Sequence, residues 1–146
     1  MDVLFLQAVL LANLCSSLAM TGLIWFVQIV HYPMFSRVGE REFAEYAKQH
    51  ARLTSLVVGP LLLIETMSAV GLAFLSGERI AVWLGLGLVG VIWVSTAVIQ
   101  IPCHTRLARG FDAGVHRRLV RSNWIRTIAW SARSGLALLS LLQEIN

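Results

Sequence analysis

Four histidines are the residues of this chain whose side chains are best suited to acid–base or metal chemistry. His31, His50 and His104 each lie beside the end of a long apolar segment, and His116 lies in a basic connection. A neutral imidazole can ligate a metal ion, and near neutral pH it can carry a proton. If the apolar segments pack together, three of these rings can converge at one end, which predicts a proton-transfer or metal-binding site there.

None of the familiar metal-binding patterns accompanies these histidines. The sequence contains no His-Glu-x-x-His pattern and no Glu-x-x-His pair of the di-iron bundles. Cys15 and Cys103 are far apart and belong to no Cys-x-x-Cys pattern, which argues against a zinc site or a disulfide framework. The cofactor stays open between none and haem, and His31 and His104 are the candidate metal or axial ligands.

Two charged residues lie deep inside apolar segments. Glu65 is about twelve residues into the second segment, and Arg133 is about ten residues into the fourth. A charge at the centre of a bilayer costs at least ~2.5–3.5 kcal/mol on insertion scales, so mutual pairing is the least costly arrangement. We expect a buried Glu65–Arg133 ion pair, which either sets helix register or handles a proton or a substrate.

Polar and aromatic residues form one stripe on each apolar segment at helical spacing. Arg126 and Asn123 lie at the mouth of the stripe on the fourth segment, where Arg126 can hold a carboxylate, phosphate or phenolate oxygen. We expect a polar pocket open to the cytoplasmic side, with His104, His50 and Arg126 as catalytic residues. The expected substrate-binding residues are Trp25, Gln28, Trp93, Gln100, Asn123 and Trp130.

Long apolar segments must position these residues. Of 146 residues, 57% are apolar and only 14% charged, whereas soluble domains are roughly 45–50% apolar and roughly 25% charged. This excess excludes a soluble enzyme, a disordered tail and a collagen-like chain. Because one membrane span takes about 20 apolar residues, the composition predicts an all-α integral membrane four-helix bundle. One transmembrane domain covers residues 1–146, with spans at about 3–32, 53–75, 80–102 and 124–142.

Two features extend this prediction. The first segment ends in Gln28-Ile-Val-His31-Tyr-Pro33 and the third in Gln100-Ile-Pro102-Cys-His104, which indicates either two hairpins in a parallel repeat or a chance similarity. The spacing within residues 40–50 predicts a helix that extends the second span, with a kink at Pro60.

The basic residues predict the orientation. Ten of the twelve Lys and Arg residues flank the first and third connections, so these connections are expected in the cytoplasm and both termini on the other side. This topology accounts for the net charge of +4 without a nucleic-acid partner. The N-terminal run lacks a basic region and is expected to remain as the first span in the cell inner (plasma) membrane. The expected partners are the lipid bilayer and a hydrophobic small molecule, with a homo-oligomer or a larger membrane complex left open.

The C-terminal half resembles a small four-span membrane family that includes the fungal anthrone oxygenases. The resemblance rests on the end of the third segment and the start of the fourth, where Pro102, Leu107, Asn123, Arg126 and Thr127 match the family pattern. The residue two after the proline is His104, where the family has Asn. The resemblance implies a four-span fold and, for the anthrone enzymes, oxidation of an electron-rich phenolic ring by dioxygen without a metal. The N-terminal half matches less well and indicates a separate bacterial branch.

Three functions remain as hypotheses from the sequence, which leaves open whether the chain is an enzyme. The first is an integral membrane oxidoreductase or oxygenase for a hydrophobic aromatic or quinone-like molecule. In it, the tryptophans would enclose the ring, Arg126 and Asn123 would hold its oxygen, and His104 or His50 would act as the base. The second is a haem-binding redox protein with two histidine ligands. The third is a non-catalytic subunit of a larger membrane complex.

Overall fold

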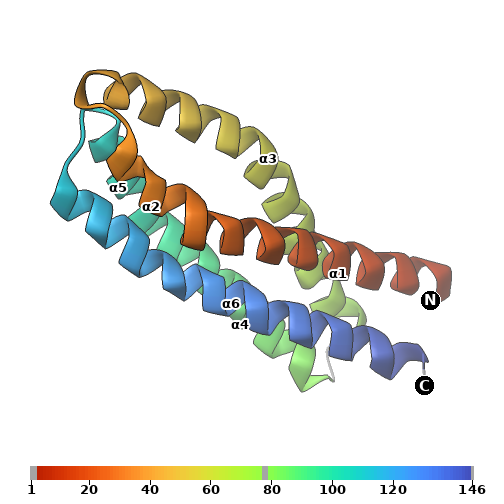
Figure 1. Ribbon diagram of the computed structural model, residues 1–146. Coiled ribbons are helices and arrows are strands. Elements are labelled where there is room, and N and C mark those ends of the chain that lie inside the picture. Colours follow the sequence, from red (N-terminus) through yellow and green to blue (C-terminus); the bar gives the residue numbers. More distant parts are fainter. Residues whose placement is uncertain (1–2, 77–78, 146) are drawn as a thin grey trace.

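The computed structural model describes residues 3–76 and 79–145, and every regular element in these ranges is a helix. The expected all-α bundle is therefore present, as four long helical rods (Figure 1). The first rod comprises α1 (Val3–Phe26), η1 (Val27–His31), α2 (Tyr32–Met34) and η2 (Phe35–Arg37), and the second is α3 (Glu40–Leu75). The third comprises α4 (Ile80–Ser95), η3 (Thr96–Gln100) and α5 (Ile101–Leu107), and the fourth is α6 (Ala113–Ile145).

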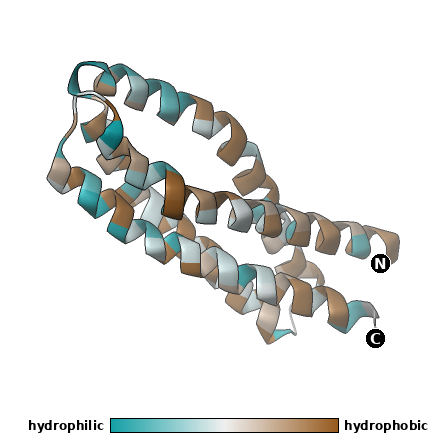
Figure 2. Ribbon diagram, in the orientation of Figure 1, coloured by the Kyte–Doolittle hydropathy of each residue, from teal (hydrophilic) through white to brown (hydrophobic). Residues whose placement is uncertain are grey.

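The rods are arranged so that α1 packs against α3 and α6, and α4 packs against the same two helices. The start of α1 and the end of α6 lie at the same end of the bundle as the end of α3 and the start of α4, whereas the η2–α3 and α5–α6 connections lie at the opposite end (Figure 1). The segments that carry the four histidines therefore meet at one end of the bundle. Hydrophilic residues gather at that end and along α6, and hydrophobic residues dominate elsewhere (Figure 2).

Three helical stretches are long and apolar enough to cross a membrane: Val3–Arg37, Glu40–Leu75 and Ile80–Leu107. The chain is therefore a membrane protein by the character of its helices. The fourth rod, α6, is not among the three, because arginines and serines lower its average hydropathy. Between residues 124 and 142 these polar residues face the interior of the bundle, as described below, whereas Arg117, Arg118 and Arg121 near the start of α6 are exposed.

The helices extend beyond the predicted apolar spans. Residues 103–122, expected as a connection, continue α5 to Leu107 and begin α6 at Ala113. Gly110, with φ of 145°, makes the turn between them. Oδ1 of Asp112 then accepts the backbone N–H groups of Gly114 and Val115 at 2.8 and 2.9 Å and caps α6. The length of an apolar segment indicates only the part of a helix that lies in lipid, so the predicted spans are shorter than the helices themselves.

Two prolines each follow a π-helical turn. The N–H of Tyr32 bonds to the carbonyl of Val27, and that of Ile101 to the carbonyl of Thr96, which makes two i to i−5 turns. Pro33 and Pro102 come next and have no N–H to donate. Such turns insert one residue into a helix and occur frequently at functional sites. Both hairpins share this feature at corresponding positions.

Pro60 lies within α3, where the sequence predicts a kink. Figure 1 shows α3 changing direction in its middle, so that its first half stands away from α1 while its second half approaches it. The buried core has two parts: one at the histidine end around Phe35, Phe43 and Trp130, and a smaller one near the chain ends around Leu10 and Leu72. The bend in α3 leaves space beside the first part.

Candidate functional site

The predicted ion pair between Glu65 and Arg133 is present and enclosed. Nε of Arg133 lies 2.6 Å from Oε1 of Glu65, and the two side chains are 2% and 0% exposed. Nη1 of Arg133 donates to the carbonyl oxygen of Gly85 at 2.9 Å. One guanidinium thereby joins α3, α4 and α6.

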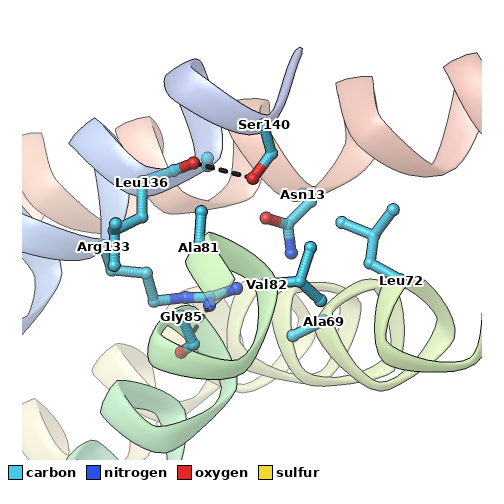
Figure 3. Close-up of a pocket in the computed structure, with 10 residues that line it drawn as sticks. Asn13, Ala69, Leu72, Ala81, Val82, Gly85, Arg133, Leu136 and Ser140 are labelled. Atoms are coloured by element: carbon cyan, nitrogen blue, oxygen red, sulfur yellow. Dashed lines mark hydrogen bonds between the residues drawn. The ribbon is translucent and has the colours of Figure 1, made fainter. Parts of the chain in front are cut away.

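The neighbours of this pair satisfy its remaining polar atoms. Ser17 Oγ donates to Oε1 of Glu65 and Trp130 Nε1 donates to Oε2, each at 2.8 Å. The amide of Asn13, oriented with its oxygen toward donors, accepts from Nη2 of Arg133 at 2.9 Å. Figure 3 shows this corner of the bundle, where the cavity measures only about 10 Å³. That is room for no more than one water molecule. We call this set the closed cluster: Asn13, Ser17, Glu65, Trp130 and Arg133.

A much larger cavity, of about 680 Å³, occupies the half of the bundle that holds the histidines. Its lining residues come from α3 on one side and from α4, η3 and α5 on the other, with α1, η1 and α6 behind. Ser55, Trp93, Ile101 and Thr105 line it and are also exposed, so it opens sideways between α3 and the third rod. This volume suits a small organic molecule.

The histidines converge as the topology predicts. Nε2 of His31 lies 2.8 Å from Nδ1 of His50, and the ring of His50 lies 5.5 Å from that of His104. Only His50 and His104 line the cavity, with His31 behind them. Phe35, which is fully buried, packs edge-on against all three rings and holds them in place.

Tyr32 joins His104 to Arg126. Its Oη lies 2.9 Å from Nε2 of His104 and accepts Nη2 of Arg126 at 3.3 Å. Arginine can only donate, so the phenolic hydrogen is available to Nε2 of a neutral His104. That tautomer places a hydrogen on Nδ1 of His104, which is buried and has no partner in the described part of the chain. An unpaired buried donor is costly, and an acceptor from a bound molecule would relieve that cost.

Arg126 is a buried cation without a carboxylate partner. It lines the cavity and is 7% exposed. The two salt bridges within residues 3–76 and 79–145 are Arg79–Glu144 and Arg133–Glu65, and neither involves Arg126. Instead, Nε and Nη2 of Arg126 donate to Oδ1 of Asn123. Burying a charge beside neutral partners alone is costly, so this cavity favours a ligand that supplies negative charge or an electron-rich oxygen.

Gln28 and Asn123 lie behind Arg126 rather than in the cavity wall, which corrects their predicted role as substrate contacts. Asn123 Nδ2 donates to Oε1 of Gln28 at 3.0 Å, and Gln28 Nε2 donates to the carbonyl of Val120 at 3.2 Å. Because Asn123 accepts two hydrogens from Arg126, it orients the guanidinium. These two residues are therefore positioning residues.

The three tryptophans do not share one pocket. Trp130 and Trp93 line the cavity, but Trp25 does not. Trp25 is 43% exposed, donates to Oγ of Ser131 at 3.0 Å and packs edge-on against Trp124. The prediction for Trp25 is wrong because α1 borders two neighbours, and this side chain points along α6 rather than toward α3.

Gln100 lines the cavity as predicted, in the second π turn. It accepts from Ser95 Oγ at 3.0 Å and donates to Ser122 Oγ at 3.3 Å, so its amide is engaged. Thr96, at the start of the same turn, has a buried hydroxyl oxygen without a partner in the described ranges. Thr96 is thus a second polar group that a ligand can satisfy.

The histidines do not form a metal or haem site as they stand. Among residues 3–76 and 79–145, no group of three or more His, Cys, Asp or Glu side chains could hold a metal ion. Nε2 of His31 faces His50, and Nε2 of His104 faces Tyr32. Axial ligation of one haem iron needs both atoms to point at the same metal. The arrangement therefore does not fit the haem hypothesis.

Several cavity residues were not among the predicted catalytic or substrate-binding residues. Tyr32, Lys48, Thr54 and Thr96 line the cavity alongside the predicted side chains. His116, expected in a connection, is buried in α6, where its Nε2 lies 2.8 Å from the carbonyl oxygen of Tyr32. A tyrosine directly before a proline at the end of an apolar segment is a signal that could have pointed to Tyr32.

No family model, curated protein or solved structure matches the chain in the three comparisons made.

Proposed function

We propose that this chain is an integral membrane oxidoreductase that binds a hydrophobic aromatic or quinone-like molecule in the 680 Å³ cavity. The observation that carries the proposal is the His104–Tyr32–Arg126 chain at the polar end of that cavity. A base, a phenol and an uncompensated cation in contact are suited to a ligand oxygen that gains negative charge.

In this proposal Arg126 and His104 act on the same oxygen. Arg126 stabilises the phenolate form of the ligand, because no described carboxylate competes for its charge. His104 or His50 takes the proton, and Tyr32 connects His104 to the guanidinium. Trp130 and Trp93 pack against the ring. The co-substrate that the resemblance to the anthrone oxygenase family implies is dioxygen: one O2 converts the ring CH2 of an anthrone into the second quinone carbonyl and releases its other oxygen atom as water.

We further propose that α6 is a fourth span and that the protein resides in a bacterial inner membrane. From residue 124 to residue 142, every exposed residue of α6 is apolar. These residues are Trp124, Ile125, Ile128, Ala132, Gly135, Leu138, Leu139 and Leu142. Within this stretch the polar residues face inward, so it presents a hydrocarbon-compatible face despite the modest average hydropathy of α6. The positive-inside rule then assigns both termini to the non-cytoplasmic side.

The test is oxygen consumption with anthrone as substrate, using purified protein in lipid nanodiscs. The wild type is expected to accelerate anthraquinone formation over protein-free nanodiscs. Replacing a general base lowers rates by about 10²–10⁴-fold, so His104→Ala should abolish most of the acceleration. Arg126→Gln should do the same.

Arg121→Gln is the matched control, because it removes an exposed charge from the same helix and should leave the rate unchanged. Absence of both anthrone binding and oxidation in the wild type would overturn the proposal. Equal rates in wild type, His104→Ala and Arg126→Gln would overturn the assigned residues.

A further inference from the structure

The large cavity has two chemically different ends. At one end lie Tyr32, His50, His104 and Arg126, together with Lys48. The charged side chains that line it are all basic. The other end is lined by Met20, Leu23 and Ile24 from α1 and by Val58 and Leu62 from α3. A ligand that fills both ends must itself be polar at one end and apolar at the other.

The cavity is also larger than a fused aromatic ring system needs. Such a ring fills only part of about 680 Å³, and empty apolar space forfeits dispersion contacts. A ring seated against Arg126 and His104 leaves the apolar end free. A flexible hydrocarbon chain attached to the ring would occupy it.

The sideways opening runs along α3 from the level of His50 to Gly59, which adjoins Val58 of the apolar end. Ala51, Ser55 and Gly59 form its edge on α3 at four-residue spacing, and all three are small. A Cβ added at Gly59 would meet nothing within 4 Å, so space remains next to it. The facing edge carries Ile101 and Thr105.

Trp93 marks where the opening ends. Its Nε1 donates to Oγ1 of Thr66 at 3.0 Å, which bridges α4 and α3. In a protein whose helices span a bilayer, an opening between two helices faces hydrocarbon, where a chain loses no solvation by remaining. The passage between Trp93 and the polar end therefore connects the cavity to lipid rather than to water.

We propose that the natural ligand is a membrane-resident amphiphile: a phenol or quinone head bound by Arg126 and His104, with a hydrocarbon chain that leaves between α3 and the third rod past Gly59. This inference rests on the proposed function, since it takes the head group and its site from there. It adds the class of substrate, its orientation and its lateral route of entry.

The test compares a 1,4-naphthoquinone without a chain with the same ring carrying a decyl chain. Binding to protein in nanodiscs is followed by quenching of tryptophan fluorescence, because Trp93 and Trp130 line the cavity. Specific binding is defined as the part of the fluorescence quenching that is absent in the Arg126→Met variant. Gly59→Leu narrows the passage. We expect it to lower the affinity for the chain-bearing quinone at least tenfold more than the affinity for the chain-free ring.

Gly90→Leu is the matched control, because Gly90 is exposed on α4, does not line the cavity and has equally free space around it. It should leave the ratio of the two affinities unchanged. Ser55→Leu, at the same edge of the passage, provides a second variant if Gly59→Leu does not fold. An unchanged ratio in both passage variants would overturn the lateral route. Absence of Arg126-dependent quenching by either quinone would instead overturn the proposed function.

Discussion

Arg133 and Arg126 lie seven residues apart on the buried face of α6, yet their surroundings differ. Arg133 is 2% exposed and pairs with Glu65, and the adjoining cavity is about 10 Å³. Arg126 is 7% exposed and bonds to an amide and a phenol, and the cavity beside it is about 680 Å³. The same residue type, two helical turns apart, serves a closed cluster in one place and an open site in the other.

The difference shows that a buried charge can serve either folding or ligand binding, depending on whether the protein itself supplies its partners. In the closed cluster each carboxylate and guanidinium atom has a partner in the protein, so the cluster can only hold helices together. At the cavity, Arg126 has no counter-ion in the described ranges, and His104 and Thr96 have unpaired buried atoms. These groups can still form hydrogen bonds or an ion pair with a ligand, whereas the groups of the closed cluster are already paired within the protein.

The largest effect is expected on breaking the closed cluster. Arg133→Leu leaves the Glu65 carboxylate buried without its cation, which should lower the free energy of unfolding by about 3–5 kcal/mol. The double variant Glu65→Leu/Arg133→Leu should recover much of this loss. Unfolding of the detergent-solubilised variants measures both. Strictly additive losses in the double variant would mean that the two charges are not coupled.

Arg126→Met should affect ligand binding more than stability, the reverse of Arg133→Leu. No carboxylate is left unpaired, but Oδ1 of Asn123 loses both hydrogens from Arg126, so the free energy of unfolding should fall by about 1–3 kcal/mol, less than in Arg133→Leu. Ligand affinity should fall by about 10–100-fold, the value of a hydrogen bond to a charged group. Thermal unfolding and quinone titration of the same preparation test this. A loss of stability as large as that of Arg133→Leu would erase the distinction between the two arginines.

Trp130→Phe probes the residue that belongs to both regions. The ring lines the cavity, and its N–H donates to Oε2 of Glu65 at 2.8 Å. Phenylalanine keeps an aromatic wall but leaves that oxygen unpaired, so stability should fall by about 1–3 kcal/mol. Anthrone turnover should change much less than in Arg126→Met. The comparison would fail if turnover were lost while stability stayed at the wild-type value.

Asp112 lies outside both regions and provides a small, pH-dependent reference. Hydrogen bonds from the backbone N–H groups of Val115 and Gly114 lower the pKa of this exposed carboxyl. Its contribution to stability is therefore present above the ordinary Asp pKa and is lost as pH falls through the lowered value. Asp112→Asn keeps the cap without the titration. The stability difference between wild type and Asp112→Asn should shrink on going from pH 6 to pH 3, as followed by thermal unfolding.

Much of this architecture was predictable because membrane chains obey strong constraints. The pairing of Glu65 with Arg133 followed from their similar depth, since neither charge can remain alone in hydrocarbon. The convergence of His31, His50 and His104 followed from helix direction, because alternate connections meet at one end. Arg126 was identified from its place at the mouth of a polar stripe.

Other features were not predictable from periodicity. A stripe on α1 gave no means of telling the neighbour α6, which Trp25 meets, from the neighbour α3, which borders the cavity. Gln28 and Asn123 were expected to touch the ligand, but they lie behind Arg126 and orient it. Whether a side chain lines the cavity or supports a lining residue depends on the distances between helices. The spacing of residues along one helix carries no information about those distances.

The amino-acid composition and the order of charges determined the helices, their polar faces and the end at which the histidines gather, because burial in hydrocarbon admits few alternatives. The tertiary structure decided where the bundle closes and where it stays open. The second half of α3 brings Glu65 onto Arg133, whereas its first half lines the open cavity beside Arg126, and α3 changes direction between the two halves (Figure 1). Two equivalent arginines of one helix thereby acquire different partners.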